Sequence, residues 1–248
     1  MSANSPLEIS RWSLSALGTR LFLYYEDRVP QEGPVIVVSN HRSFMDAPVL
    51  MAALNRPIRF ACHHYMGKVP VMREIVTGQL GCFPLEAPEH RQQGFFEQAI
   101  KLLQASQVVG VFPEGTKPMV QFIPPNQMGE FERGFAHLAL RSGSVFEGES
   151  LVRDLAILPV AIASLEEVNT SAVPLKVLSF FDPSEPLFNQ AGWHPLVIYR
   201  RVAVFIGRPY WLTLQQRQQY QGKQAKTVVA DLTNYLQTEI ASLLRQGF

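Results

Sequence analysis

Short apolar runs alternate with helical patterns along most of the chain. Runs of this length, rich in β-branched residues, are typical of buried strands. They lie at Val35–Ser39, Ile58–Cys62, Val108–Phe112, Leu155–Ala163, Leu175–Phe180 and Arg201–Ile206. Apolar positions at helical spacing predict helices over Ala47–Leu54, around Phe95, Ala99, Leu102 and Leu103, around Phe131, Phe135, Leu138 and Ala139, and over a long C-terminal segment with Val228, Leu232, Tyr235, Leu236, Ile240 and Leu243. This alternation predicts an α/β fold with a mostly parallel central sheet covered by helices.

Two boundaries between these elements can also be read from the sequence. Asp46 stands where the N-cap of the Ala47–Leu54 helix is expected, and Pro48 falls in the first turn, where proline is tolerated. The segment Asp182–Pro195 contains three prolines and is expected to be a surface loop.

The N-terminal segment Trp12–Tyr25 is predicted to be an amphipathic helix, because Leu14, Leu17 and Leu21 recur at helical spacing. One interpretation is a helix packed on the core, the usual fate of such a stripe. The other is a helix in a membrane interface, which suits its aromatic residues. We therefore expect an N-terminal helical segment over residues 1–30, with possible membrane contact, and one α/β domain over residues 31–248.

Composition narrows the classes of protein that remain. The 248 residues are 47% hydrophobic and 17% charged, with a net charge of +1, which fits a globular protein and gives no reason to expect nucleic-acid binding. Two cysteines are too few for a disulfide framework. No run is apolar enough to span a bilayer, and we expect no secretory signal, so the predicted location is peripheral, on the cytoplasmic side of a membrane.

The most reactive-looking loop follows the Val35–Ser39 strand. It reads Asn40-His41-Arg42-Ser43-Phe44-Met45-Asp46. A histidine at the end of a buried strand, with a carboxylate at the start of the next helix, can act as a general base held by an orienting partner. Backbone N–H groups of this loop are candidates for stabilising an oxyanion.

A second loop follows the Val108–Phe112 strand and reads Pro113-Glu114-Gly115-Thr116-Lys117. The backbone N–H groups of Gly115 and Thr116, the Thr116 hydroxyl and the Lys117 ammonium can together hold an anion such as phosphate. Glu114 can accept a hydrogen bond from a substrate hydroxyl. Because the carboxyl ends of parallel strands meet at one edge of a sheet, the two loops are expected to lie together.

The two loops, followed by Leu158-Pro159-Val160-Ala161-Ile162, resemble the glycerolipid acyltransferase family, which includes the 1-acylglycerol-3-phosphate acyltransferases. The resemblance runs from about Pro34 to Gly207. It implies transfer of an acyl group from acyl-CoA or acyl carrier protein to a lipid hydroxyl, without a further cofactor or a metal. By matching positions, His41 and Asp46 are the catalytic residues. The implied substrate-binding residues are Asn40, Arg42, Ser43, Glu114, Gly115, Thr116, Lys117 and Pro159.

The chain departs from the family pattern where the family binds the acceptor phosphate. Ala87 stands where an arginine is usual, and Lys117 replaces a second arginine. Arg42, Lys68, Arg73 and Arg91 are candidate replacements. The acceptor is therefore expected to be 1-acylglycerol-3-phosphate or a related lysolipid, with a neutral lipid as the alternative.

Two other functions share the same residues. A thioesterase would use His41 to activate water, and a catalytically silent protein would only bind lipid. A metal site at Cys62-His63-His64 is not favoured, because a second ligand cluster at zinc spacing is missing. Cys82 lies among apolar residues, which would keep its thiol protonated and unreactive.

Overall fold

The structure is a computed structural model that describes residues 5–62, 74, 77, 80–84, 91–115, 123–145, 155–174, 176 and 192–248. Its strands are β1 (Arg20–Tyr24), β2 (Val35–Ser39), β3 (Ile58–Cys62), β4 (Phe83–Pro84), β5 (Val108–Val111), β6 (Ala156–Pro174), β7 (Trp193–Ile206) and β8 (Tyr210–Trp211). They form one sheet in the order β1-β7-β6-β2-β5-β3-β4, with β8 also paired to β6. Most pairs are parallel, and the pairs β6–β7 and β6–β8 are antiparallel.

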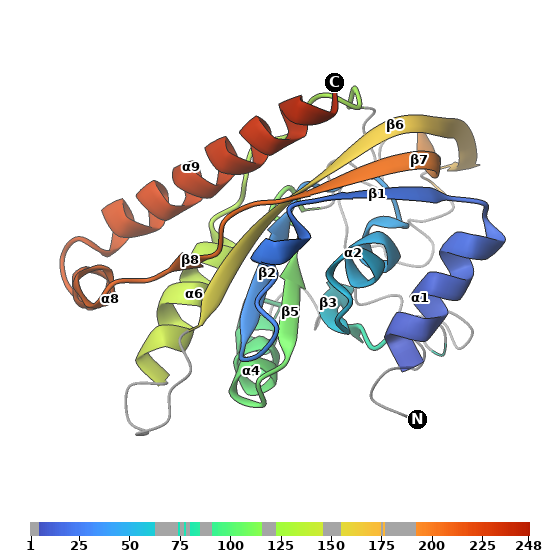
Figure 1. Cartoon of the computed structure of the whole chain (residues 1–248). Coiled ribbons are helices and arrows are strands. Elements are labelled where there is room, and N and C mark those ends of the chain that lie inside the picture. Colours follow the sequence, from blue (N-terminus) through green and yellow to red (C-terminus); the bar gives the residue numbers. More distant parts are fainter. Residues whose placement is uncertain are drawn as a thin grey trace.

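Helices cover both faces of this sheet (Figure 1). They are α1 (Ser5–Ala16), α2 (Asp46–Leu54), α4 (Arg91–Gln104), α6 (Gly134–Val145), α8 (Leu214–Gln221) and α9 (Ala225–Leu244), with short 3-10 turns η1 (Glu26–Arg28) and η6 (Arg245–Gly247). Strand β2 is buried along its whole length. Its Val35 and Val37 join the core under α1 and α2, while Ile36 and Val38 join the core under α4, α6 and α9. Burial on both faces explains why β2 reads as a continuous apolar run.

The predicted α/β class is confirmed, and the central strands β2, β3 and β5 lie within a residue of their predicted bounds. Strands β6 and β7, which follow β2 toward one edge of the sheet, are longer than predicted. Strand β6 continues past Ala163 to Pro174, and β7 begins at Trp193 rather than Arg201, so residues 193–195 are strand and not loop. Beyond Ser164, β6 pairs only with β7 and includes Glu166 and Glu167. This outer part therefore lacks the apolar run by which a buried strand is recognised in a sequence. The predicted strand Leu175–Phe180 lies almost wholly outside the described residues.

The prediction for the N-terminal segment was wrong in its second half. Helix α1 ends at Ala16, and Gly18 adopts a positive φ of 67° that a glycine tolerates without strain. Residues 20–24 form β1, which pairs in parallel with β7. Its Leu21 and Leu23 are half-buried while Phe22 and Tyr24 are exposed, a strand period of two that the leucine spacing concealed. The proposed division at residue 30 stays a prediction.

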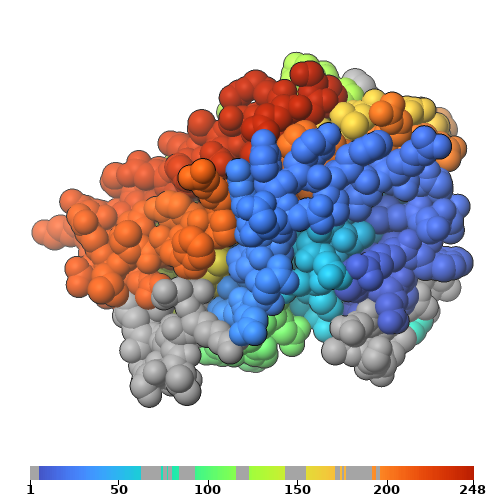
Figure 2. Space-filling model, in the orientation of Figure 1, coloured from blue at the N-terminus to red at the C-terminus, as the bar shows by residue number. Residues whose placement is uncertain are grey.

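The first half of that segment is a core helix. Leu7 and Leu14 of α1 are buried in the core that α2 shares. Figure 2 shows the N-terminal residues in blue lying along the body of the protein beside α2. Within the part of the chain that the structure describes, no helix has the length and apolarity needed to cross a membrane.

Candidate active site

The predicted base and its partner are in direct contact. The His41 ring nitrogen Nδ1 lies 2.7 Å from Asp46 Oδ2. The same oxygen accepts the backbone N–H groups of Arg42 at 2.6 Å and Ser43 at 2.8 Å. Asp46 is the first residue of α2 rather than its N-cap, which is Met45. Its carboxylate therefore closes the loop before the helix instead of capping the helix itself.

Nδ1 of His41 is engaged by Asp46, so Nε2 is the nitrogen that can take a proton from a substrate. The ring stacks on Phe112, with centroids 4.2 Å apart, and Phe112 stacks in turn on Phe60 at 5.0 Å. Sixteen per cent of the His41 side chain is exposed, against 1% for Asp46. The imidazole is thus held in one orientation while part of the side chain stays exposed.

Glu114 joins the two loops, but through backbone contacts. Its Oε1 accepts the N–H of His41 at 2.8 Å, and its Oε2 accepts the N–H of Gly129. The side chain is buried, and burial raises the pKa of its carboxyl although the two N–H donors oppose that shift. We interpret Glu114 as a structural residue that joins the ends of β2 and β5 to the 123–131 segment. The N–H groups of His41, Arg42 and Ser43 are all taken by carboxylates, so they are not available to an oxyanion.

Asn40 and Ser43 are also tied to the backbone of neighbouring strands. The Asn40 amide donates to the carbonyl of Ile162 at 2.9 Å and accepts the Ile162 N–H at 2.8 Å, as another strand residue would. The Ser43 hydroxyl donates to the carbonyl of Val197 at 2.6 Å. Both residues lie beside the dyad, and their contacts fix the loop to β6 and β7.

Arg42 is paired with Glu167 of β6. Its Nε donates to Glu167 Oε2 at 2.7 Å, its Nη2 donates to Oε1, and its Nη1 donates to the carbonyl of Ile123. Burial alone would lower the pKa of Arg42, but the hydrogen bond and charge of Glu167 outweigh it and raise that pKa. Burial would raise the pKa of Glu167, and Arg42 reverses this shift as well, so that pKa is lowered. The guanidinium therefore serves first to hold the loop against β6.

This ion pair predicts a stability change at acid pH. A carboxyl whose folded pKa is depressed stabilises the protein above its unfolded value, near 4.5, and loses that contribution as the pH falls through the lower folded value. Glu167→Gln should therefore melt at a lower temperature than wild type at pH 6. Below about pH 4 the two melting temperatures should become equal. Thermal melts across this range measure the difference. Glu166→Gln, at an exposed neighbouring position, is the matched control and should show no such pH-dependent difference. A difference independent of pH would show that the pair does not act through charge.

The remaining predicted site residues differ in what the structure shows of them. Gly115 is exposed and has a positive φ of 66°, directly after Glu114. Pro159 is buried in β6 in register with Val38, and its carbonyl accepts the Gly207 N–H at 2.8 Å. Thr116 and Lys117 lie outside the described residues, as do Lys68, Arg73 and Ala87. The substrate-binding roles assigned to these positions stay predictions.

Sequence reasoning missed a residue that touches the dyad. The hydroxyl of Tyr199 in β7 donates to Asp46 Oδ1 at 2.6 Å, and this tyrosine is completely buried. Burial and the charge of Asp46 raise the pKa of Tyr199 well above its ordinary value, so the phenol keeps its proton. A tyrosine in an apolar strand carries no local signal of such a role, because its partner lies 153 positions away.

The cysteines have the character expected of core residues. Cys62 and Cys82 are free and buried, and burial raises the pKa of their thiols to about 12 and about 11. A protonated thiol is a poor nucleophile. Over the described ranges, no group of three or more metal-ligating side chains is found, and His63 and His64 fall outside those ranges.

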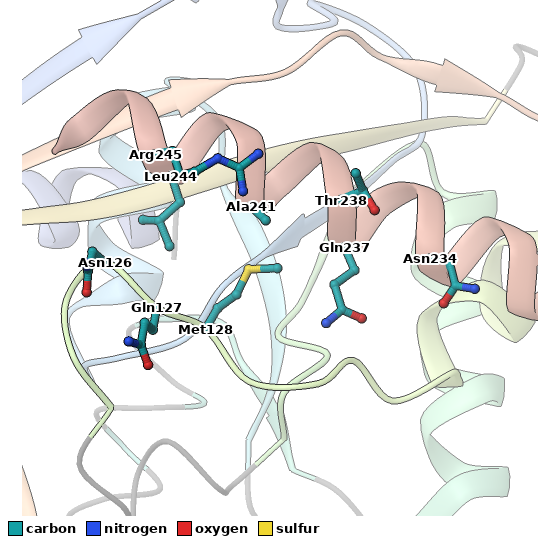
Figure 3. A pocket seen from close by; sticks show the side chains of 9 residues that line it. All are labelled: Asn126, Gln127, Met128, Asn234, Gln237, Thr238, Ala241, Leu244 and Arg245. Carbon is teal, nitrogen blue, oxygen red and sulfur yellow. The ribbon is translucent and has the colours of Figure 1, made fainter.

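A separate hollow lies between α9 and the 123–131 segment (Figure 3). Its volume is about 580 Å³, and Asn126, Gln127, Met128, Asn234, Gln237, Thr238, Ala241, Leu244 and Arg245 line it. Gly129 links this hollow to Glu114, which contacts His41. The Gly129 N–H donates to Glu114, and the Gly129 carbonyl accepts a hydrogen bond from Gln237 Nε2 at 3.4 Å. Neither His41 nor Asp46 lines this hollow, so it is separate from the dyad.

Together the fold and the site define an α/β protein with a His–Asp dyad at the carboxyl edge of its sheet. A histidine in this arrangement is suited to deprotonate a hydroxyl. The family model "Acyltransferase" matches residues 20–163, more than half of the chain, and the protein belongs to that family of enzymes.

Similar proteins agree with this assignment. A 1-acyl-sn-glycerol-3-phosphate acyltransferase of Borreliella burgdorferi is 25% identical over 142 residues, which cover 56% of this chain and 52% of that protein. The chloroplastic 1-acyl-sn-glycerol-3-phosphate acyltransferase LPAT1 of Arabidopsis thaliana is 26% identical over 119 residues, which cover 48% of this chain and 32% of that protein. The matched regions thus span about half or less of these relatives.

A solved structure has the same fold. The crystal structure of PlsC, the 1-acyl-sn-glycerophosphate (LPA) acyltransferase of Thermotoga maritima, matches with a TM-score of 0.61 and 16% identity. The match covers 98% of this chain and 78% of that one. At this identity the likeness concerns the fold.

Proposed function

We propose that this enzyme transfers a fatty acyl group from a thioester, acyl-CoA or acyl carrier protein, to the hydroxyl of 1-acylglycerol-3-phosphate or a related lysolipid. The observation that carries the proposal is the 2.7 Å contact between His41 Nδ1 and Asp46 Oδ2 at the carboxyl ends of the strands. The names of the two relatives above support the choice of acceptor.

In the proposed reaction, Nε2 of His41 takes the proton of the acceptor hydroxyl as the oxygen attacks the thioester carbonyl. Asp46 stabilises the imidazolium that forms and holds Nδ1 in the donor tautomer. The tetrahedral intermediate then collapses, the C–S bond breaks, and the thiolate leaves and takes the proton from His41. No acyl-enzyme is formed, and a thiolate is a good enough leaving group to depart with little further acid catalysis.

The proposal leaves two alternatives for the acceptor headgroup, a phosphate or a neutral group. Arg42 is at the site, but its guanidinium is already engaged by Glu167 and the Ile123 carbonyl. A phosphate would therefore depend on cations from other segments. The candidates from the sequence are Lys117, Lys68, Arg73 and Arg91. A neutral lipid acceptor is the alternative.

An acceptor screen tests both the reaction and the headgroup. Purified protein is given acyl-CoA or acyl carrier protein with lysophosphatidate, neutral lysolipids or no acceptor, and free thiol is measured with a chromogenic disulfide. We expect thiol release that requires an acceptor and is fastest with lysophosphatidate. Equal release without acceptor would replace the proposal with a thioesterase. Thiol release only with neutral lysolipids would show that the acceptor is a neutral lipid and not lysophosphatidate. Vesicle binding without any turnover would identify a silent lipid-binding protein.

We also propose peripheral contact with a membrane on its cytoplasmic side, through the N-terminal segment. Trp12 of α1 is 73% exposed although the leucines of that helix are buried, and Tyr24 and Tyr25 are exposed nearby in sequence. Exposed aromatic residues are favoured at the interface of a bilayer. Removing this segment would also remove Leu7 and Leu14 and uncover the core against which they pack, so Trp12→Ser is the cleaner test. It should weaken co-sedimentation with anionic vesicles without lowering the melting temperature, and unchanged binding would exclude this contact.

A further inference from the structure

The loop Asn40–Asp46 is held in part by residues that the family match does not include. That match ends at residue 163. Beyond it, β6 and β7 continue as an antiparallel pair in which Glu167 of β6 is in register with Tyr199 of β7. Register partners have side chains on the same face, so these two point the same way. Glu167 binds Arg42 and Tyr199 binds Asp46, so this single pair of residues contacts both ends of the loop.

The Tyr199 contact bears directly on the dyad. Asp46 Oδ2 already accepts three donors, namely His41 Nδ1 and the N–H groups of Arg42 and Ser43, while Oδ1 accepts the Tyr199 hydroxyl. With both oxygens held, the carboxylate cannot rotate away from His41. Tyr199 is itself anchored, because the hydroxyl of Thr19 donates to its carbonyl at 2.9 Å.

The geometry points to Tyr199 as a positioning residue for acyl transfer, which sets both the orientation and the charge of Asp46 opposite His41. This inference rests on the proposed role of the dyad. A hydrogen bond to a carboxylate spreads its charge and moderates its attraction for the imidazolium. Removing this hydrogen bond should therefore strengthen the attraction between Asp46 and the imidazolium of His41.

Other charged groups face the dyad and are left in place by the test. They are Arg42 on the loop itself, Glu167 on β6 and Glu114 after β5. A change in the Tyr199 hydroxyl alone can therefore be read as an effect on Asp46.

The experiment is Tyr199→Phe, which keeps the ring and removes only the hydroxyl. We expect kcat to fall about 10-fold with KM within about twofold, since the lost contact acts on the reaction rather than on binding. The midpoint of the acid limb of the kcat/KM profile should move to higher pH by about half a unit. Tyr210→Phe is the matched control, because its hydroxyl accepts Gln216 Nε2 at 2.6 Å away from the dyad. It should leave the pH profile unmoved.

A second readout separates this inference from the proposed reaction. The His41 ring signal, identified by its loss in His41→Ala, can be titrated by NMR without any substrate, and its midpoint should also move to higher pH in Tyr199→Phe. Replacing the tyrosines by 3-fluorotyrosine strengthens the phenol as a donor and should move the midpoint the other way, so the test survives even if Tyr199→Phe fails to fold. An unmoved midpoint, or lower activity that follows only a lower melting temperature, would overturn the inference. Failure of acyl transfer with a moved midpoint would count against the proposed reaction alone.

Discussion

His41→Ala should reduce acceptor-dependent thiol release by about 10³-fold, in the middle of the range of about 10²- to 10⁴-fold that a positioned general base contributes. The stacked Phe112 and Phe60 remain in place, so the substitution removes the base without removing a core residue. Initial rates with acyl-CoA and saturating lysolipid measure the effect. The loss should appear in kcat, because the imidazole stabilises the transition state of proton transfer and does not contribute to substrate binding.

His137→Ala is the control for this experiment. His137 lies on α6, where its Nδ1 is 3.1 Å from the Tyr220 hydroxyl, and it contacts neither His41 nor Asp46 in the structure. It should retain activity within about twofold, as expected for a residue outside the site. Full activity in His41→Ala would rule out the proposed mechanism even if the enzyme is an acyltransferase.

Asp46→Asn should lower kcat/KM by about 10²- to 10⁴-fold while leaving the loop folded. The asparagine oxygen can take the place of Oδ2 and accept the same three donors. Its NH₂ group can take the place of Oδ1 and donate to the Tyr199 oxygen, which reverses the direction of that hydrogen bond. The change therefore removes mainly the charge that stabilises the imidazolium, and the pH–rate profile together with thermal melts shows whether that is so.

Asp46→Ala provides the contrast, because it leaves the N–H groups of Arg42 and Ser43 without their acceptor. It should lower the melting temperature as well as the activity, since a buried unpaired donor costs about 1–3 kcal/mol. Asp231→Asn, at an exposed position of α9, controls for loss of one negative charge. Near-wild-type rates in Asp46→Asn would mean that Asp46 only shapes the loop.

Much of the fold could be read from the sequence because the central strands are buried on both faces. Val35–Ser39 is a continuous apolar run for that reason, and the predicted bounds of Val35–Ser39 and Ile58–Cys62 were correct. The edges of the sheet were harder to predict. Strand β1 has one exposed face and leucines whose spacing also fits a helix, and the outer halves of β6 and β7 pair mainly with each other. Only the pairing partners reveal such segments as strands.

The contact between His41 and Asp46 was predictable because the two residues are five positions apart, and one loop between a strand and a helix brings them together. The roles of their neighbours were not. Glu114, Asn40 and Ser43 were expected to bind substrate from the family resemblance, yet their described contacts are with backbone groups of distant segments. A polar residue near a site is as often a support as a ligand, and the sequence alone does not separate these two uses.

The sequence by itself determined the class of enzyme and the predicted base, since local spacing places His41 and Asp46 on one loop after a buried strand. The tertiary structure decided what holds that base in place. Glu167 and Tyr199 lie more than 100 positions from the loop and reach it only because β6 and β7 extend past the central sheet. Contacts between residues so far apart depend on strand register and packing, which no local pattern of residues records.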